Sequence, residues 1–130
     1  MHEYSLASEI ADIVVTVGKE NHIKKITQIN IDVGEFSFIV PEQIIFWLKI
    51  LSEQDANYSL MRDSHVEFRE IKGLIKCSSC NYQGTIPAMS DEDKTMHNLI
   101  DVTIRCPQCD SPSTTILQGR DVVVSSIQGN

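Results

Sequence analysis

The chain contains four cysteines, and they form two pairs of identical spacing, Cys77-x-x-Cys80 and Cys106-x-x-Cys109. Two intervening residues allow both sulfurs of a pair to face one ion, and two such pairs complete a shell of four thiolates. Because four protein ligands leave no position for a substrate, we expect the metal to be structural. Zinc fits this ligand set best. An iron–thiolate centre uses the same ligands, and spacing alone does not separate the two.

Two other uses of paired cysteines fit the sequence less well. Two disulfides need an oxidising compartment, yet Met1 leads directly into a helical pattern with no apolar signal region. A redox-active C-x-x-C motif is expected beside a βαβ pattern, and one pair would be enough for it. The paired cysteines therefore favour a metal centre in a cytoplasmic protein.

Length and charge limit the remaining classes of function. The 130 residues are enough for one ordinary domain, with or without a small metal-stabilised insertion. We find no apolar run of the roughly 18–20 residues that a membrane span requires. The formal net charge of −7 disfavours nucleic-acid binding, which normally needs a basic surface. We also find no phosphate-binding glycine loop, serine nucleophile motif or H-E-x-x-H sequence, so no enzymatic activity is expected.

The first half of the chain alternates between helical and extended patterns. Apolar residues at helical spacing between Tyr4 and Val17 predict an amphipathic helix that is closed by Gly18. The alternation over residues 29–33 predicts a half-buried strand. Pro41 is placed to begin a second helix, whose apolar positions continue to Leu51.

The second half predicts two more strands on either side of the cysteine motifs. Residues 55–57 are typical of a loop, and the alternation over residues 66–71 predicts a strand that runs toward Cys77. Residues 122–127 are rich in valine, and we expect them to return to the sheet of the first two strands. The predicted fold is α+β: a small mixed sheet with two helices, residues 1–73 and 118–130, interrupted by a zinc-ribbon-like domain, residues 74–117.

The amino terminus is a second candidate metal site. A histidine at position two offers an α-amine, a backbone amide and an imidazole in sequence, and Glu3 adds a carboxylate or another amide. This nitrogen-rich set suits Ni(II) or Cu(II) better than Zn(II). Amide nitrogens bind a metal only after losing a proton, so affinity should rise with pH. A histidine at position two is more often a solvated terminal residue, and Glu3 also suits a helix N-terminus.

The whole chain resembles the HypA/HybF family of hydrogenase nickel-incorporation proteins. The similarity lies in the opening Met1–Ala7, in Val33-Gly34-Glu35, in the two C-x-x-C pairs and in the closing Gly119–Val122. The M-H-E opening combined with two later cysteine pairs makes this resemblance specific. It implies a nickel-binding α/β domain with an inserted zinc domain, which agrees with the fold expected from the patterns.

The resemblance implies that the protein is a nickel metallochaperone. In that family the terminal amine, the following histidine and the next glutamate hold Ni(II), and here those positions are Met1, His2 and Glu3. The zinc domain would be structural and coupled to the nickel site. Nickel delivery would involve a HypB-type GTPase and end at the large subunit of [NiFe]-hydrogenase, and some family members also serve urease.

One departure from many bacterial members concerns the segment between the cysteine pairs. It is longer here and contains His97, which the resemblance to long-loop members suggests as a further nickel ligand when the GTPase is bound. His97 could equally pack against the zinc domain. His22 is expected to be solvated in a helix–strand turn, and His65 is expected to be structural.

Two classes of function compete with the metallochaperone. A zinc-ribbon protein-interaction module would have no nickel site at Met1. A rubredoxin-like electron carrier would hold iron at the four cysteines and would be red when purified.

Overall fold

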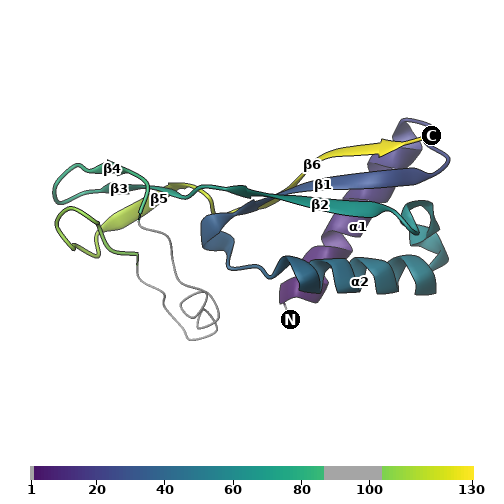
Figure 1. Cartoon of the computed structure of the whole chain (residues 1–130), viewed down its shortest axis with the longest axis horizontal. Coiled ribbons are helices and arrows are strands. Elements are labelled where there is room, and N and C mark those ends of the chain that lie inside the picture. Colours follow the sequence, from purple (N-terminus) through teal and green to yellow (C-terminus); the bar gives the residue numbers. More distant parts are fainter. Residues whose placement is uncertain (1, 87–103) are drawn as a thin grey trace. The chain divides into compact units, whose positions relative to one another are not determined.

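The computed structural model describes residues 2–86 and 104–130, which form two compact units (Figure 1). The first unit contains Met1–Asp32, Ile39–Arg69 and Val123–Asn130, and the second contains Val33–Phe38 and Glu70–Val122. Each unit has its own sheet of three strands, in the orders β2-β1-β6 and β4-β3-β5. The chain therefore leaves the first unit and returns to it, with the four cysteines in the second.

Helix α1 spans His2–Glu20, so it begins earlier and ends later than the sequence pattern predicted. The expectation that Gly18 closes the helix is wrong. A Cβ atom at Gly18 would lie 2.9 Å from Leu60 Cδ2, so glycine at this position allows the Leu60 side chain to pack closely against the helix. The helix ends at Glu20 instead, and His22 in the turn that follows has a φ of 57°, in the left-handed region. There the N–H of Ile23 donates to the carbonyl of Gly18, a common helix ending.

The first unit's sheet has strand β1, Ile26–Gly34, at its centre, with β2, His65–Ile71, and β6, Val122–Gly129, beside it. In Figure 1, β1 and β2 run in the same direction and β6 runs in the opposite one. The hydroxyl of Thr27 donates to the carbonyl of Gln128, whereas that of Ser125 donates to Asn30, as an antiparallel register requires. The predicted mixed sheet and the return of the last strand are confirmed.

Helix α2, Pro41–Gln54, begins at the predicted proline. The expected loop at residues 55–57 is wrong beyond its first residue, because Ala56–Met61 forms a 3-10 helix, η2. The Asp55 side chain accepts the N–H of Asn57 and so stabilises the start of this turn. The core of the unit is apolar and is shared by α1, β1, α2 and η2; its fully or almost fully buried members include Ala7, Ile10, Ala11, Val14, Ile26, Ile29, Ile31, Ile44, Leu48 and Met61.

The second unit is a short ribbon around the cysteines. Strand β3, Leu74–Cys77, pairs in antiparallel fashion with β4, Gln83–Gly84, and with β5, Thr114–Gln118. In the register with β5, Leu74 lies opposite Gln118 and Cys77 lies opposite Thr114. A short 3-10 turn, η1, spans Glu35–Ser37 directly after β1. The pair Leu74–Gln118 thus lies at one end of this ladder, and Cys77 lies at the other end.

Candidate metal centre

The four cysteines converge in the second unit. The four sulfurs of Cys77, Cys80, Cys106 and Cys109 all lie within 4.8 Å of one another. Two of the separations join one pair to the other: 3.7 Å from Cys77 Sγ to Cys109 Sγ and 3.6 Å from Cys80 Sγ to Cys106 Sγ. The predicted four-sulfur cluster is therefore brought together, and it could hold a metal ion.

The backbone around each pair builds a tight turn, and the two turns use the same hydrogen bonds. In the first, the N–H of Asn81 donates to the Cys77 carbonyl at 3.0 Å, and the N–H of Cys77 donates to the Tyr82 carbonyl at 2.8 Å. In the second, the N–H of Asp110 donates to the Cys106 carbonyl at 2.8 Å. The N–H of Cys106 then donates to the carbonyl of Ser111 at 3.0 Å.

The residue after each pair adopts a left-handed backbone. Asn81 has a φ of 64° and Asp110 has a φ of 61°. Asparagine and aspartate tolerate this conformation better than other side chains do, because their short polar groups can bond locally. The turn-prone residues that follow each C-x-x-C motif in the sequence therefore serve to reverse the chain, so that both sulfurs of a pair point to one place.

Backbone N–H groups surround the sulfurs and favour thiolates. The N–H of Gln108 lies 3.3 Å from Cys106 Sγ and donates to it. Hydrogen bonding from the Cys80 backbone, opposed by burial, is the main cause that lowers the pKa of Cys77 to about 6. At Cys80 the N–H of Tyr82 acts in the same direction, but burial and the three neighbouring sulfurs outweigh it and raise the pKa to about 12. Four sulfurs this close resist ionising together unless a cation offsets their charge.

The spacing of the sulfurs fits a tetrahedral metal shell. With a Zn–S bond of about 2.3 Å, the sulfurs of a regular tetrahedron are separated by roughly 3.8 Å. The separations of 3.6 and 3.7 Å lie close to this value without any disulfide bond among the four cysteines. Cys77 and Cys106 are buried and Cys109 is exposed, so one side of the shell faces solvent.

The amino-terminal candidate is described only in part. Helix α1 begins at His2, and Glu3 is half-buried in its first turn. Met1, the side chain of His2 and the whole of His97 lie outside the described residues. The backbone of His2 and Glu3 therefore belongs to the first turn of α1.

Three aromatic side chains form a cluster in the first unit, close to the start of α1. The ring of Tyr4 lies edge-on to Trp47, with 5.0 Å between ring centroids, and Phe46 lies edge-on to Trp47 at 5.1 Å. Tyr4 and Phe46 are 42% and 52% exposed. Trp47 is the single tryptophan of the chain, so its fluorescence reports on the region beside the amino terminus.

Two further histidines and Glu35 lie on other elements of the fold. His22 is exposed in the turn after α1, and His65 begins β2 with its Nε2 atom 2.7 Å from Glu67. Glu35, which the sequence analysis named only within the Val33-Gly34-Glu35 resemblance, is 6% exposed and accepts the N–H of Gly73 at 2.8 Å. Sequence reasoning missed this burial, because a glutamate after a strand is normally solvated.

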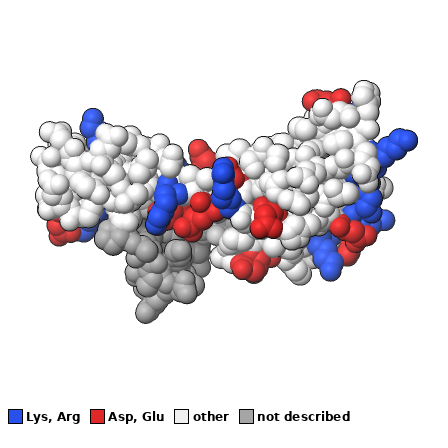
Figure 2. Space-filling model, turned by 45° about the horizontal axis from the view of Figure 1, so that its top comes forward, with Lys and Arg blue, Asp and Glu red and all other residues white. Residues whose placement is uncertain are grey.

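The face of the molecule drawn in Figure 2 carries charges of both signs. On the face drawn in Figure 2, lysine and arginine side chains alternate with aspartate and glutamate. Such interspersed charges differ from the continuous basic surface that nucleic acid attracts. Among the helices of residues 2–86 and 104–130, none has the length and hydropathy needed to cross a membrane.

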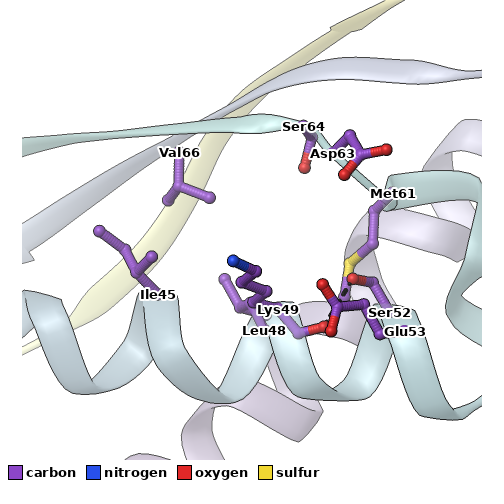
Figure 3. A pocket seen from close by; sticks show the side chains of 9 residues that line it. All are labelled: Ile45, Leu48, Lys49, Ser52, Glu53, Met61, Asp63, Ser64 and Val66. Atoms are coloured by element: carbon purple, nitrogen blue, oxygen red, sulfur yellow. Dashed lines mark hydrogen bonds between the residues drawn. The ribbon is translucent and has the colours of Figure 1, made fainter.

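A cavity of about 270 Å³ lies in the first unit between α2, η2 and β2 (Figure 3). Its apolar lining comes from Ile45, Leu48, Met61 and Val66. Its polar lining comes from Lys49, Ser52, Glu53, Asp63 and Ser64. Of the predicted metal ligands whose side chains the structure describes, Glu3 and the four cysteines are absent from this lining.

Comparison with known proteins identifies the family. Residues 1–129 match the family model described as "Hydrogenase/urease nickel incorporation, metallochaperone, hypA". The chain is similar to the hydrogenase maturation factor HypA of Methanococcus aeolicus, with 31% identity over 125 residues, which covers 93% of this chain and 90% of that protein. The HypA of Methanocella arvoryzae is 27% identical over 128 residues, covering 98% and 97%.

The fold is also shared with a solved structure. The solution structure of the nickel metallochaperone HypA from Helicobacter pylori is similar with a TM-score of 0.64 and 20% sequence identity. That similarity covers 98% of this chain and 96% of the other. At this identity the likeness supports the α+β fold, and the match to the family model over nearly the whole chain supports the assignment. The chain belongs to the HypA family of hydrogenase and urease nickel-incorporation metallochaperones.

Proposed function

We propose that this chain binds Ni(II) at its amino terminus and delivers it to a nickel enzyme that is being matured in the cytoplasm. The ligands are the Met1 amine, His2 and Glu3, and His97 joins them when a partner is bound. The partner is a HypB-type GTPase and the recipient is the large subunit of [NiFe]-hydrogenase. Relatives are named hydrogenase maturation factors, and the family description adds urease, so both enzymes are candidate recipients.

The observation that supports the nickel site best is the start of helix α1 at His2. The first four N–H groups of a helix have no acceptor within the helix, so the amides of His2 and Glu3 are not used by it. Each amide can release its proton to solvent and bind Ni(II) through the deprotonated nitrogen without breaking a helical hydrogen bond. The positive end of the helix dipole disfavours a cation, but two deprotonated amides and the Glu3 carboxylate offset it with negative charge.

The same site is suited to release. Its ligands belong to two or three residues at the end of the chain, and all of them are sensitive to protons. The α-amine has a reference pKa of about 7.7–8.0, and the imidazole has one of about 6.5. A small change in proton access or in the position of a further ligand therefore loosens the ion, which a carrier needs and an enzyme cofactor site does not.

The four-cysteine centre has the opposite role in this proposal. Its sulfurs fit a tetrahedral Zn²⁺ shell with all four positions filled by protein. Zinc there stabilises the fold of the second unit and is retained while nickel is exchanged. We propose residues 1–73 and 118–130 as the nickel-binding domain and residues 74–117 as the zinc-binding domain. The chain acts as a carrier and catalyses no reaction of its own.

A transfer assay tests the delivery function. Untagged protein is loaded with one equivalent of nickel and mixed with the HypB-type GTPase and the nickel-free hydrogenase large subunit, and nickel in the large subunit is then measured. We expect His2→Ala to abolish loading and transfer while the zinc content stays unchanged. His22→Ala is the matched control, because His22 is an exposed histidine in the turn that follows the same helix.

Two results would contradict the proposal. Wild-type nickel affinity in His2→Ala would place the nickel site elsewhere on the chain. Wild-type protein that binds zinc but neither binds nor transfers nickel would favour the alternative, a zinc-ribbon module that acts only through protein contacts.

A further inference from the structure

Glu35 is a buried carboxylate in the second unit. The residue is 6% exposed and its side chain is 2% exposed, and with Ser52 it is one of two buried polar residues in the described part of the chain. Removing a carboxylate from water is costly unless other groups satisfy it. A glutamate therefore persists in this position only because its partners hold it there.

Its partners lie where the chain enters the cysteine ribbon. One carboxylate oxygen accepts the N–H of Gly73 at 2.8 Å, and the other lies 3.9 Å from the ammonium group of Lys72. Gly73 immediately precedes Leu74, the first residue of β3. Because Lys72 is largely exposed, the short bond to Gly73 is the stronger of the two contacts. Glu35 thus fixes the backbone at the entrance of the ribbon.

The same segment also binds the chain where it leaves the ribbon. The N–H of Phe36 donates to the carbonyl of Gly119 at 2.7 Å, directly after β5 ends at Gln118. The side-chain amide of Gln118 donates to the carbonyl of Lys72 at 2.9 Å and so joins exit to entrance. Both ends of the ribbon are therefore tied to residues 35 and 36 and to each other.

Three segments of the chain, residues 34–36, 72–73 and 118–119, lie so close together here that glycine is required. A Cβ atom at Gly73 would lie 2.2 Å from the Phe36 ring, and one at Gly34 would lie 2.2 Å from the Gly119 carbonyl oxygen. Gly119 has a φ of 101°, which L side chains rarely adopt. The contact is therefore a specific, closely packed junction, which we call the Glu35 clamp (Gly34, Glu35, Phe36, Lys72, Gly73, Gln118 and Gly119).

The clamp and the four sulfurs close opposite ends of one short ladder. From the Leu74–Gln118 pair to the Cys77–Thr114 pair, β3 advances by three residues, which is about 10 Å. A ladder this short does not open at one end without loosening the other. We propose that Glu35 is a positioning residue for the four-cysteine metal centre, so that metal retention at the sulfurs and closure of the clamp stabilise each other.

The proposal predicts two linked measurements. Metal release from zinc-loaded protein is followed with a chromogenic chelator, and hydrogen exchange of the Gly73 amide is followed by NMR. We expect Glu35→Ala to speed metal release roughly tenfold to hundredfold, the change in an equilibrium constant that corresponds to losing a buried hydrogen bond to a charged group. Gly73 exchange should accelerate in the same variant, and removing the metal from wild-type protein should also accelerate it, because such coupling is reciprocal.

Three control variants separate positioning from general destabilisation. Glu35→Gln keeps an oxygen that can accept the Gly73 N–H, so we expect it to lie between wild type and Glu35→Ala. Ser52→Ala removes the other buried polar side chain, which belongs to the first unit, and should leave metal release unchanged. Lys72→Ala should have a small effect. Amides of Ile29 and Ile31 should exchange at wild-type rates in both Glu35 variants.

The inference rests on metal binding by the four cysteines, which the zinc content of wild-type protein tests first. Wild-type protein without metal would refute that centre and the coupling together, while Gly73 exchange would still report on the clamp. Unchanged metal release in both Glu35 variants would overturn the inference, even if Gly73 exchange increased. An equal acceleration at Ile29, Ile31 and Gly73 would also overturn it, because it would indicate global unfolding.

Discussion

Replacing Cys106 with alanine should unfold the second unit and leave the first one folded. Cys106 is 2% exposed and its sulfur lies 3.6 Å from that of Cys80, so the substitution removes one ligand from the centre of the shell. Apart from the cysteines, the buried apolar side chains of this unit are those of Val33, Phe36 and Ile75 within the described residues. The unit therefore depends on its metal more than on its core.

The magnitudes favour this expectation. Burial of a side chain such as valine, phenylalanine or isoleucine contributes about 1.5–3 kcal/mol, so the three together contribute roughly 5–9 kcal/mol. Structural zinc in small domains binds with an apparent free energy of about 10–16 kcal/mol, which becomes folding free energy when the site forms only in the folded state. The metal is thus the larger of the two contributions. The first unit has its core in α1, β1, α2 and η2 and contains none of the cysteines.

Urea denaturation and hydrogen exchange together test the prediction. Trp47, in the first unit, reports on that unit by fluorescence, and the amide of Ile75 in β3 reports on the ribbon. In Cys106→Ala we expect the Ile75 amide to lose its protection from exchange, while the free energy of unfolding followed by Trp47 fluorescence changes by about 0.5 kcal/mol or less. Ser79→Ala, inside a cysteine turn, removes no metal ligand and only an exposed hydrogen bond with Ser111, so it should keep Ile75 protected. Retained Ile75 protection in Cys106→Ala and in chelator-treated protein would refute the reasoning.

Three further predictions follow from particular contacts. Gly73→Ala should destabilise the protein by about 1–3 kcal/mol in urea denaturation, because its Cβ would lie 2.2 Å from the buried Phe36 ring; wild-type stability would contradict the packing described. Tyr58→Phe should cost about 0.5–1.5 kcal/mol at neutral pH, since the Tyr58 hydroxyl donates to Asp12 at 2.6 Å. That hydrogen bond raises the pKa of Tyr58 above 10.0, so its contribution should be complete below pH 10 and decline as pH rises through the folded pKa; an advantage over Tyr58→Phe that grows above pH 10 would have the wrong sign. Nickel affinity should increase between pH 6 and 8.5 as the amine, imidazole and amides lose protons, and calorimetric titrations showing no pH dependence would exclude these ligands.

Much of the first unit could be predicted from local patterns. The helical spacing in α1, the alternation in β1 and the proline at the start of α2 each indicated the correct element, because one face of each is buried and the other is solvated. The predicted end of α1 was wrong because Gly18 provides space for Leu60 and does not terminate the helix. A single sequence does not distinguish these two uses of glycine.

The four-cysteine centre could be predicted from the sequence, whereas the burial of Glu35 could not. The spacing of the cysteines was sufficient to predict their convergence, since the geometry of a tetrahedral shell is local to each C-x-x-C turn. The burial of Glu35 depends on its hydrogen bond with Gly73, which is 38 residues away, and no local pattern indicates such a contact. Strand β4 was also not predicted, because two residues are too few to show alternation.

The account is tested most directly by a nickel titration of untagged protein beside a variant with one extra residue before Met1. Zinc is quantified in both proteins, and Trp47 fluorescence follows binding near the terminus. The account predicts one tightly bound nickel in the untagged protein and loss of that site in the extended variant, with equal zinc in both. Equal nickel binding by the two proteins would contradict a chelate formed by the free amine, His2 and Glu3.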